Sequence, residues 1–183
     1  MDLTTKRVPY LICRGAKVIY LVRHAAGRHN ETKDYDNPKF VDAILTAKGK
    51  EQAIALRNNP DLKDPDFVIA SPLSRAFNTA SLAFPDSKIV IDPLCREKRS
   101  FKCDLLRHEF ENTPDLLTET ETELIIRAKL FVEKLRELEF PKVIVVTHGA
   151  FMNAITSVLA GKDHLYKTKY FTNTEILKIN LED

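Results

Sequence analysis

The sequence has no Cys-x-x-Cys pair, no long apolar run and no excess of charge of one sign. Its three cysteines, Cys13, Cys95 and Cys103, form neither a complete disulfide framework nor a familiar zinc pattern, so reduced thiols are expected. No apolar run approaches the roughly 20 residues of a membrane span, and Arg14 interrupts the apolar start of the chain before a secretory signal could form. These absences predict a cytoplasmic protein that has no membrane partner.

The charge balance and the length narrow the class further. The 28 Lys and Arg against 26 Asp and Glu leave a net charge of +2, which is too balanced to suggest nucleic acid as a partner. A chain of 183 residues can bury roughly 70% of its unfolded surface, which excludes disordered and mini-protein classes. With no internal repeat or linker, residues 1–183 are expected to form one domain, and the oligomeric state stays open.

Short apolar runs rich in β-branched residues predict the strands. The runs do not alternate between apolar and polar residues, as is typical of parallel strands buried on both faces. The closing stretch, residues 172–183, alternates imperfectly and predicts an edge strand, which we expect to be antiparallel. The uninterrupted runs are residues 18–22, 67–70, 89–91 and 143–146.

Helical patterns with start signals lie between these runs. Thr46 precedes one pattern, Pro72 opens another, and Thr118 with Glu121 has the spacing of a capping box. A further pattern after residue 150 is expected to end at Gly161. The longest pattern is an apolar stripe that ends before Pro141 and contains Leu124, Ala128, Phe131, Leu135 and Leu138. Strands and helices alternate, which predicts an α/β three-layer sandwich around a mostly parallel sheet.

Polar residues follow the predicted strands and mark a site, because ligands of α/β sheets bind beyond the carboxyl ends of the strands. Two histidines, three arginines and one carboxylate should meet there. Arginine binds phosphoryl oxygens bidentately, a neutral imidazole can attack phosphorus, and a carboxylic acid can protonate a leaving oxygen. The residues concerned are Arg23, His24, Arg75, Arg96, Glu97 and His148.

Four blocks in a fixed order carry a family resemblance. They are LVRHAAGRHN (21–30), DAILTAKGKEQA (42–53), ASPLSRAFNTA (70–80) and VVTHGAF (145–151). Their order and spacing resemble the histidine phosphatase superfamily, also called the phosphoglycerate mutase-like family. CREKRSFKCD (95–104) and RHAAGRHN make a branch of plant, fungal and protist relatives look closest. Ala25 stands where the commonest motif has glycine, and it adds only a methyl group.

The resemblance implies a role for each matched residue. His24 would be the nucleophile and carry the phosphoryl group as phosphohistidine. Arg23, Arg75 and His148 would hold the nonbridging oxygens. Glu97 would give a proton to the leaving oxygen and take one from water. Neither a metal nor a cofactor is implied. The residues expected to contact the phosphorylated substrate are Asn30, Arg96, Lys98 and Gly149.

The remaining polar residues have plainer interpretations. His29 is expected to be a surface histidine in a loop, and His108 and His164 are expected to be plain surface histidines. Cys95 and Cys103 are expected to be buried or free thiols. The basic run that includes Lys98, Arg99 and Lys102 could recognise a second anionic group or could simply be solvated, and the sequence leaves both open.

Three functions compete at this point: a phosphatase, a phosphoglycerate mutase, and an inactive member of the family that serves as a binding module. Glu97 and His148 are 51 positions apart, and this interval must also hold a long helix and a strand. It leaves room for only a small lid, so water should enter and hydrolysis is favoured. Every matched catalytic position is filled, which argues against the binding module.

Overall fold

Five strands form one sheet in the order β3-β2-β4-β1-β5. The computed structural model describes residues 17–112, 118–166 and 169–181; Cys13 and the predictions made for the amino-terminal segment lie outside them. Parallel pairing joins β1 to β4 and β2 to both β3 and β4, whereas β5 runs antiparallel to β1 at the edge. The strands are β1 (Lys17–Arg23), β2 (Phe67–Ala70), β3 (Ile89–Ile91), β4 (Lys142–Thr147) and β5 (Ile176–Leu181).

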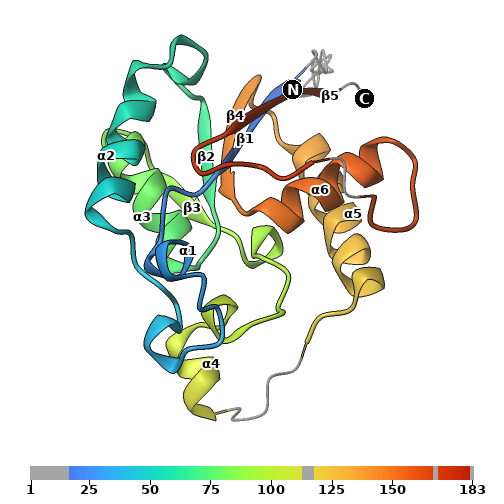
Figure 1. Cartoon of the computed structure of the whole chain (residues 1–183). Helices are drawn as coiled ribbons and strands as arrows, with labels where there is room; N and C mark the ends of the chain where they lie inside the picture. Colours follow the sequence, from blue (N-terminus) through green and yellow to red (C-terminus); the bar gives the residue numbers. More distant parts are fainter. Residues whose placement is uncertain (1–16, 113–117, 167–168, 182–183) are drawn as a thin grey trace, which may run out of the picture.

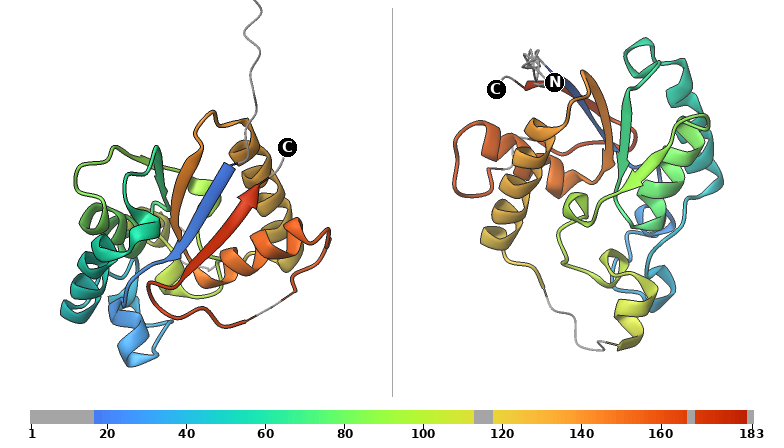
Figure 2. Two further views of the ribbon diagram at one scale, coloured as in Figure 1. Left: turned by 90° about the horizontal axis from the view of Figure 1, so that it is seen from above. Right: turned by 180° about the vertical axis from the view of Figure 1, so that it is seen from behind.

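The four main helices cover both faces of the sheet, which confirms the predicted fold class (Figures 1 and 2). Alternate side chains of β1 enter opposite layers: Leu21 packs in the cluster that includes α5 and α6 residues, and Val22 packs in the cluster that includes α3 residues. The four helices are α2 (Ala47–Ala55), α3 (Ser74–Ala83), α5 (Glu121–Glu137) and α6 (Gly149–Leu159).

Two predicted helix ends are confirmed. The Thr46 hydroxyl accepts a hydrogen bond from the Gly49 N–H at 3.0 Å, which caps α2. Gly161 follows α6 with φ of 68°, a left-handed conformation that suits glycine, and its N–H donates to the Val158 carbonyl. Helix α3 begins at Ser74, two residues after Pro72.

The predicted start of α5 is wrong by two residues. The capping box is formed by Thr120 and Glu123, not by Thr118 and Glu121. Glu123 accepts from the Thr120 N–H at 2.8 Å, and the Thr120 hydroxyl accepts from the Glu123 N–H at 3.2 Å. Both pairs have the same spacing, but Glu119, which lies between the two threonines, turns inward to pair with Arg127 at 2.7 Å. That contact holds the chain just before Thr120, and the helix begins after it.

Short elements gather at the carboxyl end of the parallel strands, below the sheet in Figure 1. They are α1 (Arg28–Thr32), α4 (Arg107–Asn112) and the 3₁₀ turns η4 (Pro93–Cys95) and η5 (Lys102–Asp104). Three other 3₁₀ turns are η1 (Pro38–Phe40), η2 (Leu56–Asn58) and η3 (Pro60–Leu62). No helix within the described ranges is long and apolar enough to cross a membrane.

Candidate active site

The two adjacent central strands bring the two motif histidines together. Arg23 pairs in register with Thr147 at the ends of β1 and β4. The residues that follow these two strands, His24 and His148, therefore leave the sheet at the same point. The His24 N–H donates to the Thr147 carbonyl at 2.9 Å, and the two imidazole centroids lie 5.1 Å apart. Both rings are buried. The parallel pairing therefore places two imidazoles side by side at the edge of the core.

His24 has the tautomer of a nucleophile. Its Nδ1 lies 2.7 Å from the Ala25 carbonyl oxygen. Because a carbonyl only accepts, Nδ1 carries the proton and Nε2 keeps its lone pair. Burial lowers the pKa of His24 well below its ordinary value, and the charges of Arg75 and Arg23 lower it further. The ring is therefore neutral and nucleophilic at neutral pH.

Ser71 orients the second imidazole, a role that the sequence did not indicate. Its hydroxyl oxygen lies 2.8 Å from His148 Nε2 and also accepts from the Leu73 N–H at 3.3 Å. If the hydroxyl donates to Nε2, the proton of His148 sits on Nδ1, which is buried and has no partner among the described residues. Burial and the charge of Arg75 also lower the pKa of His148. A neutral ring with a free Nδ1–H can donate to a bound oxygen.

Arg75 is almost fully buried, with 1% of its surface exposed. One of its terminal nitrogens donates to the Cys103 carbonyl at 2.7 Å and the other to Asp104 at 2.9 Å. Asp104 also accepts from the N–H groups of Ser100 and Phe101, so the loop that carries it folds around the arginine. Arg75 Nε has no partner within the described chain.

Arg23 projects from the end of β1 into the same cavity. It donates to the Phe171 carbonyl, and its guanidinium lies 5.2 Å from the centroid of the Tyr170 ring. Arg23 Nε is buried and has no partner among the described residues. Two buried arginines with free donors thus approach the histidine pair, which suits an anion.

Glu97 supplies the carboxyl group of the site. Its Oε1 accepts from the Lys98 N–H at 3.0 Å. Burial, followed by the negative charge of Asp104, raises the pKa of Glu97 to about 6, although Arg75 opposes the shift. A carboxyl group with this pKa can both give and take a proton near neutral pH.

Arg127 fixes the loop that carries this acid, a role that no sequence pattern indicates. From α5 it donates to the main-chain carbonyls of Leu94 and Arg96 at 2.7 and 2.8 Å, and it pairs with Glu119. An arginine in the polar part of an amphipathic helix looks like any solvated residue until the loop packed against it is known.

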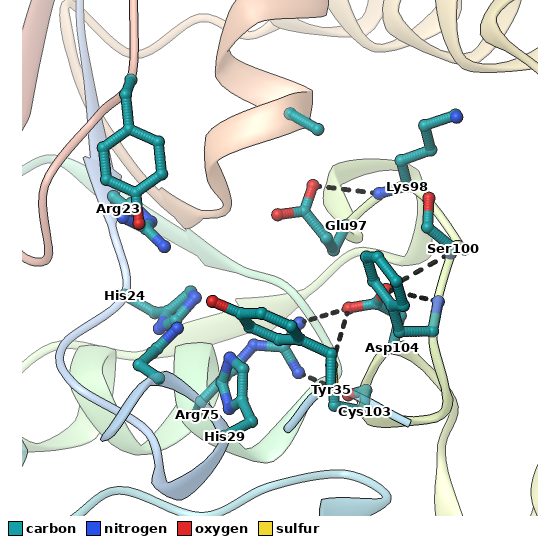
Figure 3. Close-up of a pocket in the computed structure, with 14 residues that line it drawn as sticks. Arg23, His24, His29, Tyr35, Arg75, Glu97, Lys98, Ser100, Cys103 and Asp104 are labelled. Carbon is teal, nitrogen blue, oxygen red and sulfur yellow. Dashed lines mark hydrogen bonds and ion pairs between the residues drawn. The ribbon is translucent and has the colours of Figure 1, made fainter. Parts of the chain in front are cut away.

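Of the predicted catalytic residues, Arg23, His24, Arg75 and Glu97 line one cavity of about 210 Å³. His148 is not among the residues that line it, and its ring lies behind that of His24 at a centroid distance of 5.1 Å. Figure 3 shows Arg23, His24 and Arg75 on one side of it and Glu97 on the other. Of the residues expected to contact substrate, Asn30 and Lys98 line this cavity, and Gly149 lines an adjoining one together with Arg23 and Glu97. The remaining lining residues are His29, Tyr35, Ser100, Phe101, Cys103, Asp104, Ala150 and Tyr170.

Arg96 does not line either cavity, contrary to expectation. Its two terminal nitrogens bind Glu109 of α4 at 2.6 and 2.8 Å, and one of them also donates to the Asp104 carbonyl. Glu109 binds both terminal nitrogens of this guanidinium at once, so Arg96 stays in the ion pair and does not turn toward the cavity. Arg96 therefore ties its own loop to α4 and to the Asp104 backbone. Of the basic run, the side chain that lines the cavity is that of Lys98.

The interpretation of His29 as a surface residue is wrong. Only 3% of its surface is exposed, and its ring centroid lies 5.8 Å from that of His24. Burial, then the charges of Arg75 and Arg23, lowers the pKa of His29 to about 3, so the ring is neutral. The Tyr35 ring lies against it edge-on at a centroid distance of 5.9 Å, from a loop that no sequence pattern indicates.

The predictions for the other histidines and for the two cysteines are confirmed. His108 and His164 are exposed. Cys95 and Cys103 are buried and unpaired, and burial raises the pKa of both thiols, which keeps them protonated and unreactive.

Comparison with known proteins gives a consistent family. The family model described as "Histidine phosphatase superfamily (branch 1)" matches residues 19–183. The Hydrogenobacter thermophilus protein named "Putative phosphoserine phosphatase 2" is 28% identical over 91% of this chain and 90% of its own length. The mycobacterial glucosyl-3-phosphoglycerate phosphatase, whose structure was solved with VO3, superposes with a TM-score of 0.70 at 18% identity, over 89% of this chain and 90% of that one.

A plant relative matches a shorter region. The "Phosphoglycerate mutase-like protein" of Arabidopsis thaliana is 42% identical over 77 residues, which are 37% of this chain and 28% of the relative. This match covers too little of either chain to place the protein among the plant, fungal and protist relatives, so that placement stays a prediction.

Proposed function

This chain belongs to the histidine phosphatase superfamily, and we propose that it hydrolyses phosphomonoesters through a phosphohistidine intermediate on His24. One observation carries the proposal: His24 Nδ1 lies 2.7 Å from the Ala25 carbonyl oxygen, a contact that assigns the proton to Nδ1 and leaves Nε2 unprotonated beside two buried arginines. The substrate class is a phosphorylated small molecule or protein.

In the first step Nε2 of His24 attacks phosphorus, the P–N bond forms, and the bond from phosphorus to the ester oxygen breaks. Arg23, Arg75 and the Nδ1–H of His148 stabilise the charge that spreads over the three nonbridging oxygens. Protonated Glu97 gives its proton to the leaving oxygen, so the alcohol departs neutral.

In the second step a water molecule attacks the phosphohistidine from the side that the alcohol has left. Ionised Glu97 takes a proton from this water, the P–N bond breaks, and inorganic phosphate leaves with the electron pair of that bond returned to Nε2. Both steps use the same acid in opposite directions, which suits a carboxyl group with a pKa of about 6.

The cationic side chains supply the charge that a metal ion supplies in other phosphatases, so we propose that the reaction is metal-independent. Arg23 and Arg75 are permanently charged and already lie beside His24. A chelator such as EDTA should therefore leave the rate unchanged. Loss of activity with EDTA and its return with Mg²⁺ would mean that this part of the proposal is wrong.

The test is phosphate release by the full chain over a panel of phosphomonoesters that includes O-phosphoserine, 3-phosphoglycerate and p-nitrophenyl phosphate. Wild type should turn over part of this panel and incorporate acid-labile phosphate. His24→Ala should lose at least about a thousandfold in rate and all incorporation, because the nucleophile is gone. His164→Ala, an exposed histidine outside the cavity, is the matched control and should keep wild-type activity.

Two results would favour the other candidates. Interconversion of phosphoglycerates after priming with the bisphosphate, without phosphate release, would identify a mutase, the activity suggested by the name of the plant relative. Binding of phosphorylated ligands with no turnover and no incorporation would identify an inactive binding module. Equal rates for His24→Ala and wild type would move the nucleophile to another residue.

A further inference from the structure

A row of aromatic rings leads from the nucleophile to the surface. The centroids of His24 and His29 are 5.8 Å apart, those of His29 and Tyr35 are 5.9 Å apart, and those of Tyr35 and Phe101 are 5.4 Å apart. All four residues line the cavity of the site, and Figure 3 shows Tyr35 and His29 beside His24. The four rings therefore form an aromatic wall of the cavity that runs from buried His24 to exposed Phe101.

The outer part of this wall is open to solvent. Phe101 is 42% exposed, and Tyr170, which lies against Arg23 at another part of the same cavity, is 78% exposed. Exposed aromatic side chains at the mouth of a pocket are typical of ligand-binding surfaces, because a bound ligand covers apolar area that water otherwise contacts.

The proposed reaction places the leaving group at this mouth. In-line attack by His24 puts the leaving oxygen on the opposite side of phosphorus, near Glu97. The rest of the alcohol must then extend away from the buried arginines, between Lys98 and the exposed rings. The aromatic wall therefore contacts the part of the substrate that distinguishes one phosphomonoester from another.

Charge at the mouth is sparse. Among the described residues that line this cavity, Lys98 is the one cation besides the two arginines that face phosphorus. Lys169 lines the adjoining cavity, where it pairs with Glu175. Arg96 is occupied by Glu109, and Arg107 donates to the Val41 carbonyl. A leaving group with several anionic groups would find few partners here, whereas a planar ring would find several.

We infer that the preferred substrate is a small-molecule phosphomonoester whose alcohol carries an aromatic ring, with Phe101 and Tyr35 as the residues that select it. This inference rests on the proposed hydrolase function. The ring would stack on Phe101 and Tyr35 in offset or edge geometry, contacts that an aliphatic group of equal size makes less well.

The test compares two alkyl phosphates that differ only in the ring, 2-phenylethyl phosphate and 2-cyclohexylethyl phosphate. Both release a primary alcohol, so leaving-group acidity is matched. Wild type should prefer the phenyl compound by about three- to tenfold in kcat/KM. Phe101→Leu and Tyr35→Leu should each lower this ratio toward one. Phe140→Leu, which removes an aromatic ring stacked on Phe67 and outside the cavity, is the control and should keep the wild-type ratio.

The outcomes separate the two proposals. Turnover of both compounds at equal kcat/KM, or a ratio that Phe101→Leu and Tyr35→Leu leave unchanged, would overturn the aromatic preference while the hydrolase stands. A preference for O-phosphoserine over 2-phenylethyl phosphate would replace it with recognition of a charged alcohol by Lys98. Release of phosphate from no ester would overturn the hydrolase itself.

Discussion

At the scale of single residues, burial shifts the pKa values of the histidines and of the acid in opposite directions. Burial and the neighbouring arginines both disfavour protonated imidazole, so the two effects add and His24 stays neutral. For Glu97 the effects oppose each other: Arg75 favours the carboxylate, but burial and Asp104 outweigh it and raise the pKa to about 6. The result is a neutral nucleophile next to an acid that is partly protonated near neutral pH.

The pKa of Glu97 sets the pH dependence of the first step. Because protonated Glu97 must donate to the leaving oxygen, kcat/KM for alkyl phosphates should fall as the pH rises above about 6. Glu97→Gln should lower kcat/KM for alkyl phosphates about 100-fold or more and remove this fall, since an amide has no proton to give. For p-nitrophenyl phosphate, whose leaving group needs little protonation, the loss should be smaller.

Stability should respond to the same group. Folding raises the pKa of Glu97 from 4.5 to about 6, so its contribution to stability is present below pH 4.5 and is lost as the pH rises through 6.

If Glu97→Gln lowered kcat/KM equally for alkyl phosphates and for p-nitrophenyl phosphate, the acid would be another residue. Glu111→Gln, an exposed glutamate outside the cavity, is the control for both measurements.

Residues could be predicted from the sequence where their position follows from the end of a strand, and not where it depends on a loop. Arg23, His24 and His148 end apolar strands, so the rule that parallel strands share one functional edge placed them together. The His29 ring lies against Tyr35, and Arg96 is paired with Glu109. Both partners lie in irregular segments or short helices whose path no local pattern encodes.

At the scale of elements, two helices hold the loop that follows the nucleophile. The N–H of Ala25 donates to the Thr79 hydroxyl of α3 at 3.0 Å, and the N–H of Ala26 donates to Gln52 of α2 at 2.9 Å. The Ala26 carbonyl accepts from the Thr46 N–H at the start of α2. The motif residues of the second and third sequence blocks thus act as supports for the loop that follows His24.

Gly49 allows this contact because α2 packs directly on the loop backbone. A Cβ at position 49 would lie 2.1 Å from the Ala26 carbonyl oxygen. Gly49→Ala improves helix propensity by about 1 kcal/mol, but relief of the clash must move α2 or the loop, which costs about 1–3 kcal/mol and displaces the main chain after His24. We expect a net destabilisation in urea unfolding and a lower kcat.

The exposed neighbour Lys50 provides the control on the same helix. Lys50→Ala changes propensity by a small amount and meets no loop atom, so its free energy of unfolding should stay within about 0.5 kcal/mol of wild type. If Gly49→Ala were as stable and active as Lys50→Ala, the close contact between α2 and the loop would not be important.

The elements themselves were the most predictable level. All five strands and the four main helices were expected from apolar runs and three- to four-residue periodicity, because these patterns need no knowledge of the partner. The start of α5 was missed since TETETE at 118–123 offers two pairs with capping-box spacing. Only the tertiary contact between Glu119 and Arg127 decides between them.

At the scale of the whole molecule, the net charge of +2 hides a local concentration of positive charge. Arg75 and Arg23 are buried beside three neutral histidines, and Asp104 pairs with only one of the two arginines. Buried cations of like sign oppose folding because little water screens them. A dianion in the cavity should relieve this repulsion, so ligand binding and stability should be linked.

Inorganic phosphate or orthovanadate should therefore raise the melting temperature of the protein. At 100 times its Kd a ligand that binds only the folded state adds about 2.7 kcal/mol, which for a chain of this length corresponds to a shift of about 5–10 °C. Chloride at equal ionic strength should give a much smaller shift, since it screens charge but cannot bind both guanidinium groups. In Arg23→Met the phosphate shift should shrink, because one of the two free Nε donors is lost. Equal shifts with phosphate and chloride would show that the cavity does not bind a phosphoryl group selectively, and the link between local charge and stability would then be wrong.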